Sequence, residues 1–203
     1  MSDKVLYENP LNTRYASREM QENFGDRKRF RLWRKLWIAL AESEMELGLP
    51  ITQAQIDDMK AHADDIDYAR ADNYEKQFRH DVMAHVHAFG DAAPSAASII
   101  HLGATSCFVD CNSELIIMKD GLDILLKKLV NVMDKLRKFA LAYKDVPTLG
   151  FTHLQPAQLT TVGKRATLWI NELMMDLEEC ERRIASLTMR ILSIFMIISV
   201  CAA

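Results

Sequence analysis

The longest regular pattern in this sequence is an apolar seam between residues 110 and 144. Its residues recur at alternating intervals of four and three positions, which predicts a helix about 50 Å long at about 1.5 Å per residue. A second apolar row, formed by Leu126, Met133 and Ala140, lies beside the seam. A helix that is apolar on two sides should pack inside a bundle of several long helices. The seam consists of Leu115, Met118, Leu122, Leu125, Leu129, Val132, Leu136, Phe139 and Tyr143.

The rest of the chain also predicts helices. One should begin with Asp26 as its cap and end at Gly48, and "TQAQ" from Thr52 is a capping-box pattern for a short helix. A single helix is expected over 67–89, with Phe78, Val82, Val86 and Phe89 as its buried stripe, and a last helix should start near Thr160 or Thr161. Because no stretch alternates as a strand does, the fold class is predicted to be all-α.

The chain divides by pattern into three parts. Residues 1–111 form an N-terminal helical domain, residues 112–186 begin a long-helix bundle, and residues 187–203 are an apolar tail. The uncharged end of the tail, Ile191–Ala203, would span about 20 Å as a helix, which is too short for a hydrocarbon core of about 30 Å. We expect an altered C-terminus here and no membrane partner.

Composition and charge exclude several classes of partner. Apolar residues make up 49% of the chain, charged residues 26%, and the net charge is −3, as in a globular protein with no general attraction to nucleic acid. One basic stretch, residues 26–35, places Arg27, Arg31, Arg34 and Lys35 on one helical face. Nearby acids offset these charges, so the stretch favours a solvated helix face over a nucleic-acid site.

The cysteines and the N-terminus indicate a reducing compartment. Cys107, Cys111, Cys180 and Cys201 form no C-x-x-C pair, and "MSDKVLYENP" has no signal-peptide pattern. A cytoplasmic protein is therefore expected.

The histidine-rich stretch "RHDVMAHVHAFG", residues 79–90, raises the question of a metal site. Two ligands on one helix converge when they are three or four positions apart, and no pair among His80, His85 and His87 has that spacing. We therefore predict no metal. Asp81 and His85, four apart, can pair on the helix surface, which gives His85 a structural role. His80 stays open as either a functional group or an ordinary helix residue.

Two further segments concentrate polar groups between helices. "LGFTHLQPAQLTT", residues 149–161, carries Thr152, His153, Gln155 and Gln158 in a connection, where binding and catalytic groups are common. His153 is either a proton-transfer group or a cap for the next helix.

"IHLGATSCFVDCN", residues 100–112, precedes the longest helix. It is either an anion-binding helix start, with His101, Thr105 and Ser106, or a simple N-cap supplied by Ser106 or Asp110.

Four stretches together resemble the adenylosuccinate lyase family of the fumarase/aspartase superfamily. They are "NTRYAS", "RHDVMAHV", "IHLGATSCFVD" and "PTLGFTHLQPAQLTTVGKR", and the likeness runs in order from about residue 5 to 184. The resemblance implies elimination of fumarate from adenylosuccinate, to give AMP, and from the succinylated carboxamide ribotide of purine synthesis. It also implies a small-molecule substrate, no cofactor, and a homotetramer whose active sites are shared between subunits.

The resemblance also implies roles for individual residues. His153 would be the general acid, and His80 would contact the substrate and assist it. Arg14 and Tyr15 would hold the substrate phosphate. The other implied binding residues are Arg79, Asp81, His101, Thr105, Ser106, Thr152 and Gln155. The likeness ends at "ECERRI", and the family's serine-containing loop, which supplies the base, would lie beyond it. A non-catalytic helical fragment that assembles with full-length subunits, or a sibling lyase acting on another succinylated amine, are the alternatives.

Overall fold

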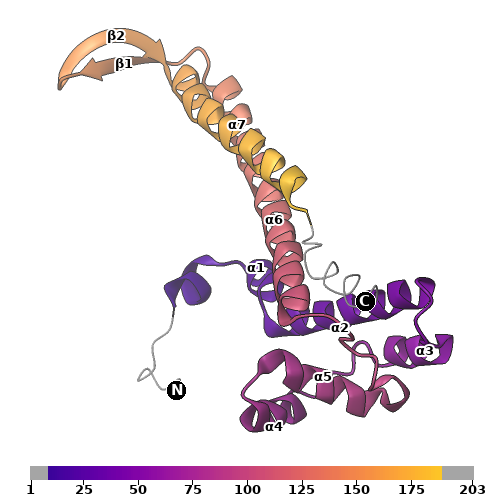
Figure 1. Ribbon diagram of the computed structural model, residues 1–203. Coiled ribbons are helices and arrows are strands. Elements are labelled where there is room, and N and C mark those ends of the chain that lie inside the picture. Colours follow the sequence, from indigo (N-terminus) through magenta and orange to yellow (C-terminus); the bar gives the residue numbers. More distant parts are fainter. Residues whose placement is uncertain (1–8, 189–203) are drawn as a thin grey trace, which may run out of the picture. The chain divides into compact units, whose positions relative to one another are not determined.

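The computed structural model describes residues 9–188, which form two compact units (Figure 1). The first unit ends at Met118, and the second unit spans Lys119–Thr188. The predicted tail, residues 187–203, lies almost entirely outside the described residues. No helix within residues 9–188 is long and apolar enough to cross a membrane.

The first unit is built from several helices, of which α2 is the longest that lies wholly within it, and from the start of α6. These elements are η1 (Leu11–Tyr15), α1 (Arg18–Asn23), α2 (Asp26–Glu46), α3 (Gln53–Ala61), α4 (Tyr68–Phe78), α5 (Asp81–Ala92), η2 (Pro94–Ala96) and the first part of α6 (Ser106–Ala142).

The helix ends largely follow the predicted capping signals. At α3 the Thr52 hydroxyl accepts from the Gln55 N–H, and the Gln55 side chain accepts from the Thr52 N–H at 2.9 Å, so the capping box is confirmed. The N-cap of α2 is Gly25, one residue before the predicted Asp26. Past the end of α2, Gly48 has φ +90, the left-handed conformation that a Cβ would strain.

The single helix predicted over 67–89 is wrong, because the chain breaks between α4 and α5. Arg79 takes the left-handed conformation (φ 54), and its N–H closes α4 on the Glu75 carbonyl at 2.7 Å. His80 is then extended and becomes the N-cap of α5, where Nδ1 accepts from the Met83 N–H. The apolar periodicity continued across this break, although Phe78 itself is exposed.

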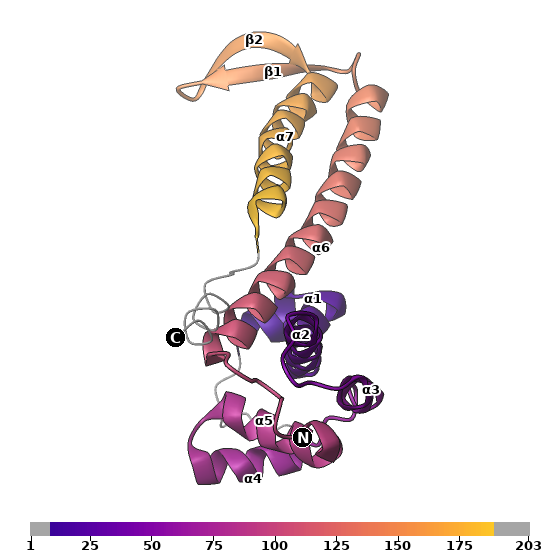
Figure 2. The same ribbon diagram turned by 45° about the vertical axis from the view of Figure 1, so that its right-hand side comes forward.

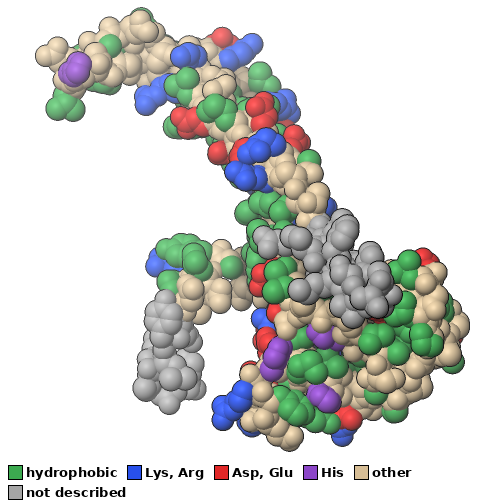
Figure 3. Space-filling model, in the orientation of Figure 1, with side chains coloured by type: hydrophobic (Ala, Val, Ile, Leu, Met, Phe, Trp, Pro, Cys, Tyr) green, Lys and Arg blue, Asp and Glu red, His purple; other side chains and the backbone are tan. Residues whose placement is uncertain are grey.

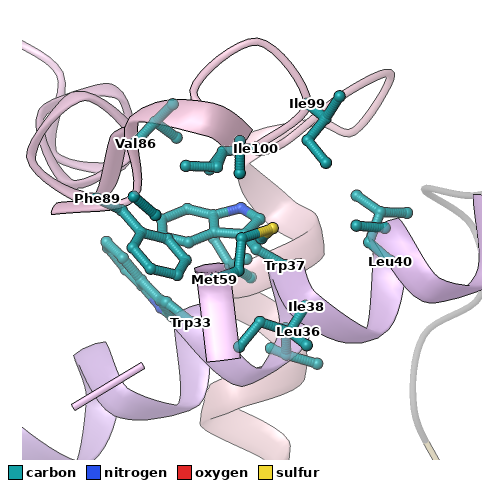
Figure 4. Close-up of a cluster of buried hydrophobic side chains, with 14 of the residues drawn as sticks. Trp33, Leu36, Trp37, Ile38, Leu40, Met59, Val86, Phe89, Ile99 and Ile100 are labelled. Atoms are coloured by element: carbon teal, nitrogen blue, oxygen red, sulfur yellow. The ribbon is translucent and has the colours of Figure 1, made fainter. Parts of the chain in front are cut away.

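The core of the first unit surrounds two tryptophans of α2. Trp33 and Trp37 are 0% and 1% exposed, and Figure 4 shows Phe89 of α5 and Met59 of α3 beside them. The two indole rings meet edge to face, with centroids 6.1 Å apart. Their indole N–H groups donate to Ser113 of α6 at 3.1 Å and to His101 at 2.9 Å. The core therefore ties α2 to the segment that leads into α6.

The solvated basic face predicted for residues 26–35 is wrong at one position. Arg34 is 2% exposed, its guanidinium donates to the His62 carbonyl, and it lies 4.4 Å from the centroid of the Phe89 ring. Burial, opposed by Asp65 and Asp64, lowers the Arg34 pKa to about 10. Arg27 and Lys35 are exposed, as predicted.

The second unit pairs two helices and carries a β-hairpin. It contains the remainder of α6, β1 (Pro147–Thr152), β2 (Gln155–Thr161) and α7 (Val162–Ser186). The strands are antiparallel, with Pro147 opposite Thr161 and Thr152 opposite Gln155. The predicted all-α fold class is confirmed for the described residues, which are helical apart from this hairpin, whereas the expectation that they would contain no sheet is wrong. The hairpin gave no alternating signal because most of its residues on both faces are exposed.

Helices α6 and α7 run antiparallel within the second unit (Figure 2). At one end the Gly163 N–H donates to the Tyr143 carbonyl at 2.9 Å, and at the other the Cys180 thiol lies 4.0 Å from the Leu122 carbonyl. A Cβ on Gly163 would overlap the Ala140 carbonyl and come within 2.7 Å of the Lys144 Cα. Glycine is therefore required where the two backbones meet.

Candidate functional site

The first unit brings two of the predicted site residues into contact. His80, the N-cap of α5, and Ser106, the first residue of α6, are 26 positions apart, and the His80 Nε2 lies 3.2 Å from the Ser106 Oγ. Because Nδ1 of His80 accepts the Met83 N–H, the neutral ring carries its proton on Nε2 and donates to Ser106. His80 is thereby oriented by backbone on one side and by a hydroxyl on the other.

Arg79 and Asp81 flank this pair. The Asp81 carboxylate accepts from the Val82 N–H at 2.8 Å and lies 3.7 Å from the His80 Nδ1. Arg79 lines an open surface hollow together with Asp72, Glu75 and Lys76. The left-handed Arg79 backbone is what turns the chain from α4 into the His80 cap.

His101 belongs to the same region. Its ring is half-buried, and Nδ1 accepts the Trp37 indole N–H at 2.9 Å. Burial lowers the His101 pKa, and the nearby imidazole of His80, when it is protonated, lowers it further. Thr105 is exposed and precedes α6, where its carbonyl accepts the Phe108 N–H.

Asp110 is a candidate that the sequence suggested only as an N-cap. It lies one turn after Ser106 on α6, and burial followed by the Asp81 charge raises its pKa, while Arg29 and His80 act in the opposite direction. The four-residue spacing from Ser106 in "SCFVDCN" was the available signal.

Arg14 and Tyr15 occupy the last two positions of η1. Both are exposed, and the Arg14 guanidinium lies 5.4 Å from the centroid of the Tyr15 ring. Within the described residues they contact each other and are not in contact with His80 or Ser106.

The second unit holds the other predicted residues at the hairpin tip. Thr152 and Gln155 face each other across the strands, and His153 and Leu154 form the two-residue turn between them. Both turn residues have positive φ, 48° and 62°, the geometry of a type I′ turn, which usually carries Asn or Gly. His153 is exposed in this turn. His153 does not cap α7, since the Thr161 hydroxyl accepts the Lys164 N–H at 3.1 Å.

Backbone strain coincides with these groups. Four non-glycine residues among those described have positive φ: Arg79, His101, His153 and Leu154. Three of the four are predicted site residues. A left-handed non-glycine residue costs of order 1–3 kcal/mol, and such residues cluster at functional sites.

His85 and His87 lie outside this arrangement. His85 stacks on Phe30 with centroids 3.8 Å apart, and burial, followed by the charges of Arg34 and Arg29, lowers its pKa to about 4. His87 stacks on Phe78 at 4.6 Å. Within residues 9–188, no three His, Cys, Asp or Glu side chains are grouped so that they could hold a metal ion.

Comparison with known proteins shows the family of this chain. The sequence profile of the lyase family matches residues 13–193, which is most of the chain. The chain belongs to the lyase family.

Within that family, the chain is similar to adenylosuccinate lyases. The chain is 56% identical over 185 residues to adenylosuccinate lyase of Saccharomyces cerevisiae, and 55% identical over 182 residues to that of Schistosoma mansoni. Each match covers 90% of this chain, and the chain spans only 38% of the length of either relative.

Solved structures show the same fold. A 3-carboxy-cis,cis-muconate lactonizing enzyme from Pseudomonas putida matches with a TM-score of 0.75 at 25% identity, over 86% of this chain and 41% of that one. A fumarate lyase from Mesorhizobium sp. BNC1 matches with a TM-score of 0.75 at 23% identity, over 87% of this chain and 41% of that one.

Proposed function

We propose that this chain forms the acid-bearing part of a lyase that eliminates fumarate from adenylosuccinate to give AMP, and from succinylaminoimidazole carboxamide ribotide. The 56% identity to an adenylosuccinate lyase supports this substrate class. The geometric observation that carries the proposal is the contact between His80 and Ser106, which joins two of the resembling motifs at one place.

The reaction needs one base and one acid. A base removes the proton from the carbon beside a carboxylate, the electron pair forms the fumarate double bond, and the carbon–nitrogen bond breaks. The departing nitrogen takes a proton from His153, because imidazole is the side chain best suited to proton transfer near neutral pH. The resemblance assigns the base to a serine-containing loop in the part of the relatives that this chain does not span.

The binding groups match the substrate's charges. The substrate carries a phosphate and two carboxylates, for which guanidinium and hydroxyl groups are suitable partners. We assign the phosphate to Arg14 and Tyr15, and the succinyl carboxylates to Thr105 and Ser106, with His80 assisting the acid. The remaining proposed contacts are Arg79, Asp81, His101, Thr152 and Gln155.

We also propose that the enzyme is a cytoplasmic homotetramer. On α6, four large apolar residues, each seven positions after the last, are 40–50% exposed: Met118, Leu125, Val132 and Phe139. The intervening seam residues Leu122, Leu129 and Leu136 are less exposed. The less exposed leucines are therefore partly covered within the chain. The four exposed residues form an apolar surface that supports packing against further copies of the chain. Figure 3 shows hydrophobic side chains at the surface of the second unit.

A subunit-complementation assay tests the proposal. The chain is co-expressed with the S. cerevisiae relative whose histidine corresponding to His153 has been replaced by alanine, and fumarate release from adenylosuccinate is followed. We expect the mixture to regain turnover, and we expect His153→Ala in this chain to lower it by about 10²–10⁴-fold. The matched control is His87→Ala, an exposed histidine outside the site, which should restore turnover fully.

Each of the other outcomes contradicts one part of the proposed function. Restoration that survives His153→Ala would refute the acid assignment. Failure of the folded chain to restore turnover would favour a non-catalytic helical fragment. A substrate panel in the same assay distinguishes a sibling lyase, which would prefer another succinylated amine.

A further inference from the structure

Trp37, a core residue of α2, is hydrogen-bonded to His101 of the candidate site. Its indole is 1% exposed on α2, and its N–H donates to the His101 Nδ1 over 2.9 Å, although the two residues are 64 positions apart. The two rings are nearly perpendicular, at 84°, with centroids 5.9 Å apart. The ring plane and one nitrogen of His101 are thus set by a buried partner.

The chemistry of this hydrogen bond allows one neutral form of His101. An indole N–H is only a donor, so Nδ1 must hold a free lone pair, and the ring proton must lie on Nε2. Protonating Nδ1 would bring two N–H groups against each other. Burial also disfavours protonation of His101, and so does the nearby imidazole of His80 at the start of α5 when that ring is protonated.

Two further features fix the position of His101. Its backbone is left-handed (φ 65), so the ring leaves the chain in a different direction than it would from an extended backbone. One helical turn before Trp37, Trp33 donates to the Ser113 hydroxyl at 3.1 Å and so anchors α6, whose first residue is the His80 partner Ser106. Successive turns of α2 therefore hold both sides of the site.

We propose that Trp37 is a positioning residue: by donating to Nδ1 it holds His101 as the neutral Nε2–H tautomer, which presents a hydrogen-bond donor to an anionic group of the substrate. The presentation to substrate rests on the proposed function; the tautomer does not. A neutral donor binds an oxyanion without offering the substrate a second acid, so proton delivery stays with His153.

The test is nuclear magnetic resonance of the ¹⁵N-labelled 203-residue chain. We expect a through-hydrogen-bond ¹⁵N–¹⁵N coupling between the Trp37 indole nitrogen and the His101 Nδ1, and a ring ¹⁵N pattern with the proton on Nε2. Trp37→Phe keeps an aromatic ring and removes the donor. It should abolish the coupling and raise the His101 pKa, and in the complementation assay it should lower turnover about tenfold, the worth of one hydrogen bond.

Trp33→Phe is the matched control, because it also removes a buried indole N–H from α2, but its partner is Ser113. It should leave the His101 coupling and titration unchanged. Absence of the coupling in the wild-type chain, or equal titration shifts in both variants, would overturn the inference. Since the spectra require no turnover, a chain that shows the coupling and restores no activity would refute the proposed function and leave the tautomer assignment standing.

Discussion

The two units of this chain differ in how far they bury their large apolar side chains. The first unit buries its large side chains among themselves, with Trp33, Trp37, Ile56, Met59 and Phe89 all at 0–1% exposure. The second unit leaves Phe151 66%, Leu159 77% and Leu154 99% exposed, together with Leu125, Val132 and Phe139 of α6. A paired set of helices with a hairpin has too little interior to cover its own apolar surface.

The difference explains where precise geometry is found. Around the tryptophan core, His80, His101 and Ser106 each have a defined hydrogen-bond partner. Within residues 9–188, His153 at the hairpin tip is held by its backbone conformation, with no side-chain hydrogen bond. The contrast teaches that a tightly packed core can position site residues within one chain, whereas an exposed tip requires contacts from outside it.

The largest effect is expected from removing the central core residue. Trp33→Ala should destabilise the chain by about 3–5 kcal/mol, through a cavity and the loss of the donor to Ser113. Phe151→Ala, also a large aromatic truncation, should change stability by less than about 0.5 kcal/mol because the side chain is largely exposed. Urea unfolding measured at low protein concentration compares the two. Equal losses would break the contrast between the units.

Acid should weaken the first unit through His85. Its pKa is lowered from 6.5 to about 4 in the folded state, so the unfolded chain binds the proton first. The stability that His85 contributes is present above pH 6.5 and is lost as the pH falls to about 4, by about 3 kcal/mol at most. His85→Phe, which can retain the stack on Phe30, should flatten this slope in unfolding measured between pH 7 and 4. An unchanged slope would contradict the assignment.

A smaller effect is expected at the backbone contact of the second unit. Gly163→Ala places a Cβ against the Ala140 carbonyl and the Lys144 Cα, which should cost about 1–3 kcal/mol and separate the ends of α6 and α7. Ala166→Gly, on the same helix, serves as the control for helix propensity, with an expected loss of about 1 kcal/mol. Amide exchange at Gly163 and Val162 should rise in the first variant. Protection that stays at the wild-type level would show that the close approach is absent.

The smallest effect concerns the strained turn. Leu154→Gly removes the Cβ penalty at φ 62 and should stabilise the hairpin by about 0.5–1 kcal/mol. The same change at Leu149, within β1, should weaken it instead. Exchange rates of the strand amides report both, and a destabilising Leu154→Gly would mean that the turn is not left-handed.

Much of the helical fold could be predicted from local signals. The capping box at Thr52, the apolar seam of α6 and the start of α7 at Thr161 all depend on residues within a few positions of one another. The break at Arg79 could not be predicted, because neither glycine nor proline marks it and the apolar spacing continues beyond it. The hairpin was missed because its turn lacks the usual Asn-Gly pair.

The candidate site was predictable only in part, because local sequence patterns do not show contacts between distant residues. Motifs identified His80, His101, Ser106 and His153 as candidates, but the partners that orient them are distant in sequence. The indole donor to His101 lies 64 positions away, and the Ser106–His80 contact spans 26. Tertiary packing alone creates such pairs, so periodicity and spacing within one segment carry no sign of them.

Hydrogen exchange at several protein concentrations tests the central contrast most directly. The account predicts that amides of α2 and α5 in the tryptophan core are strongly protected at every concentration. Protection of α7, of the hairpin and of α6 beyond Lys119 should increase with protein concentration, because further copies of the chain cover the exposed Leu125, Val132 and Phe139 of α6. Protection of the second unit that is strong and independent of concentration would contradict the account, since that unit would then be stable by itself.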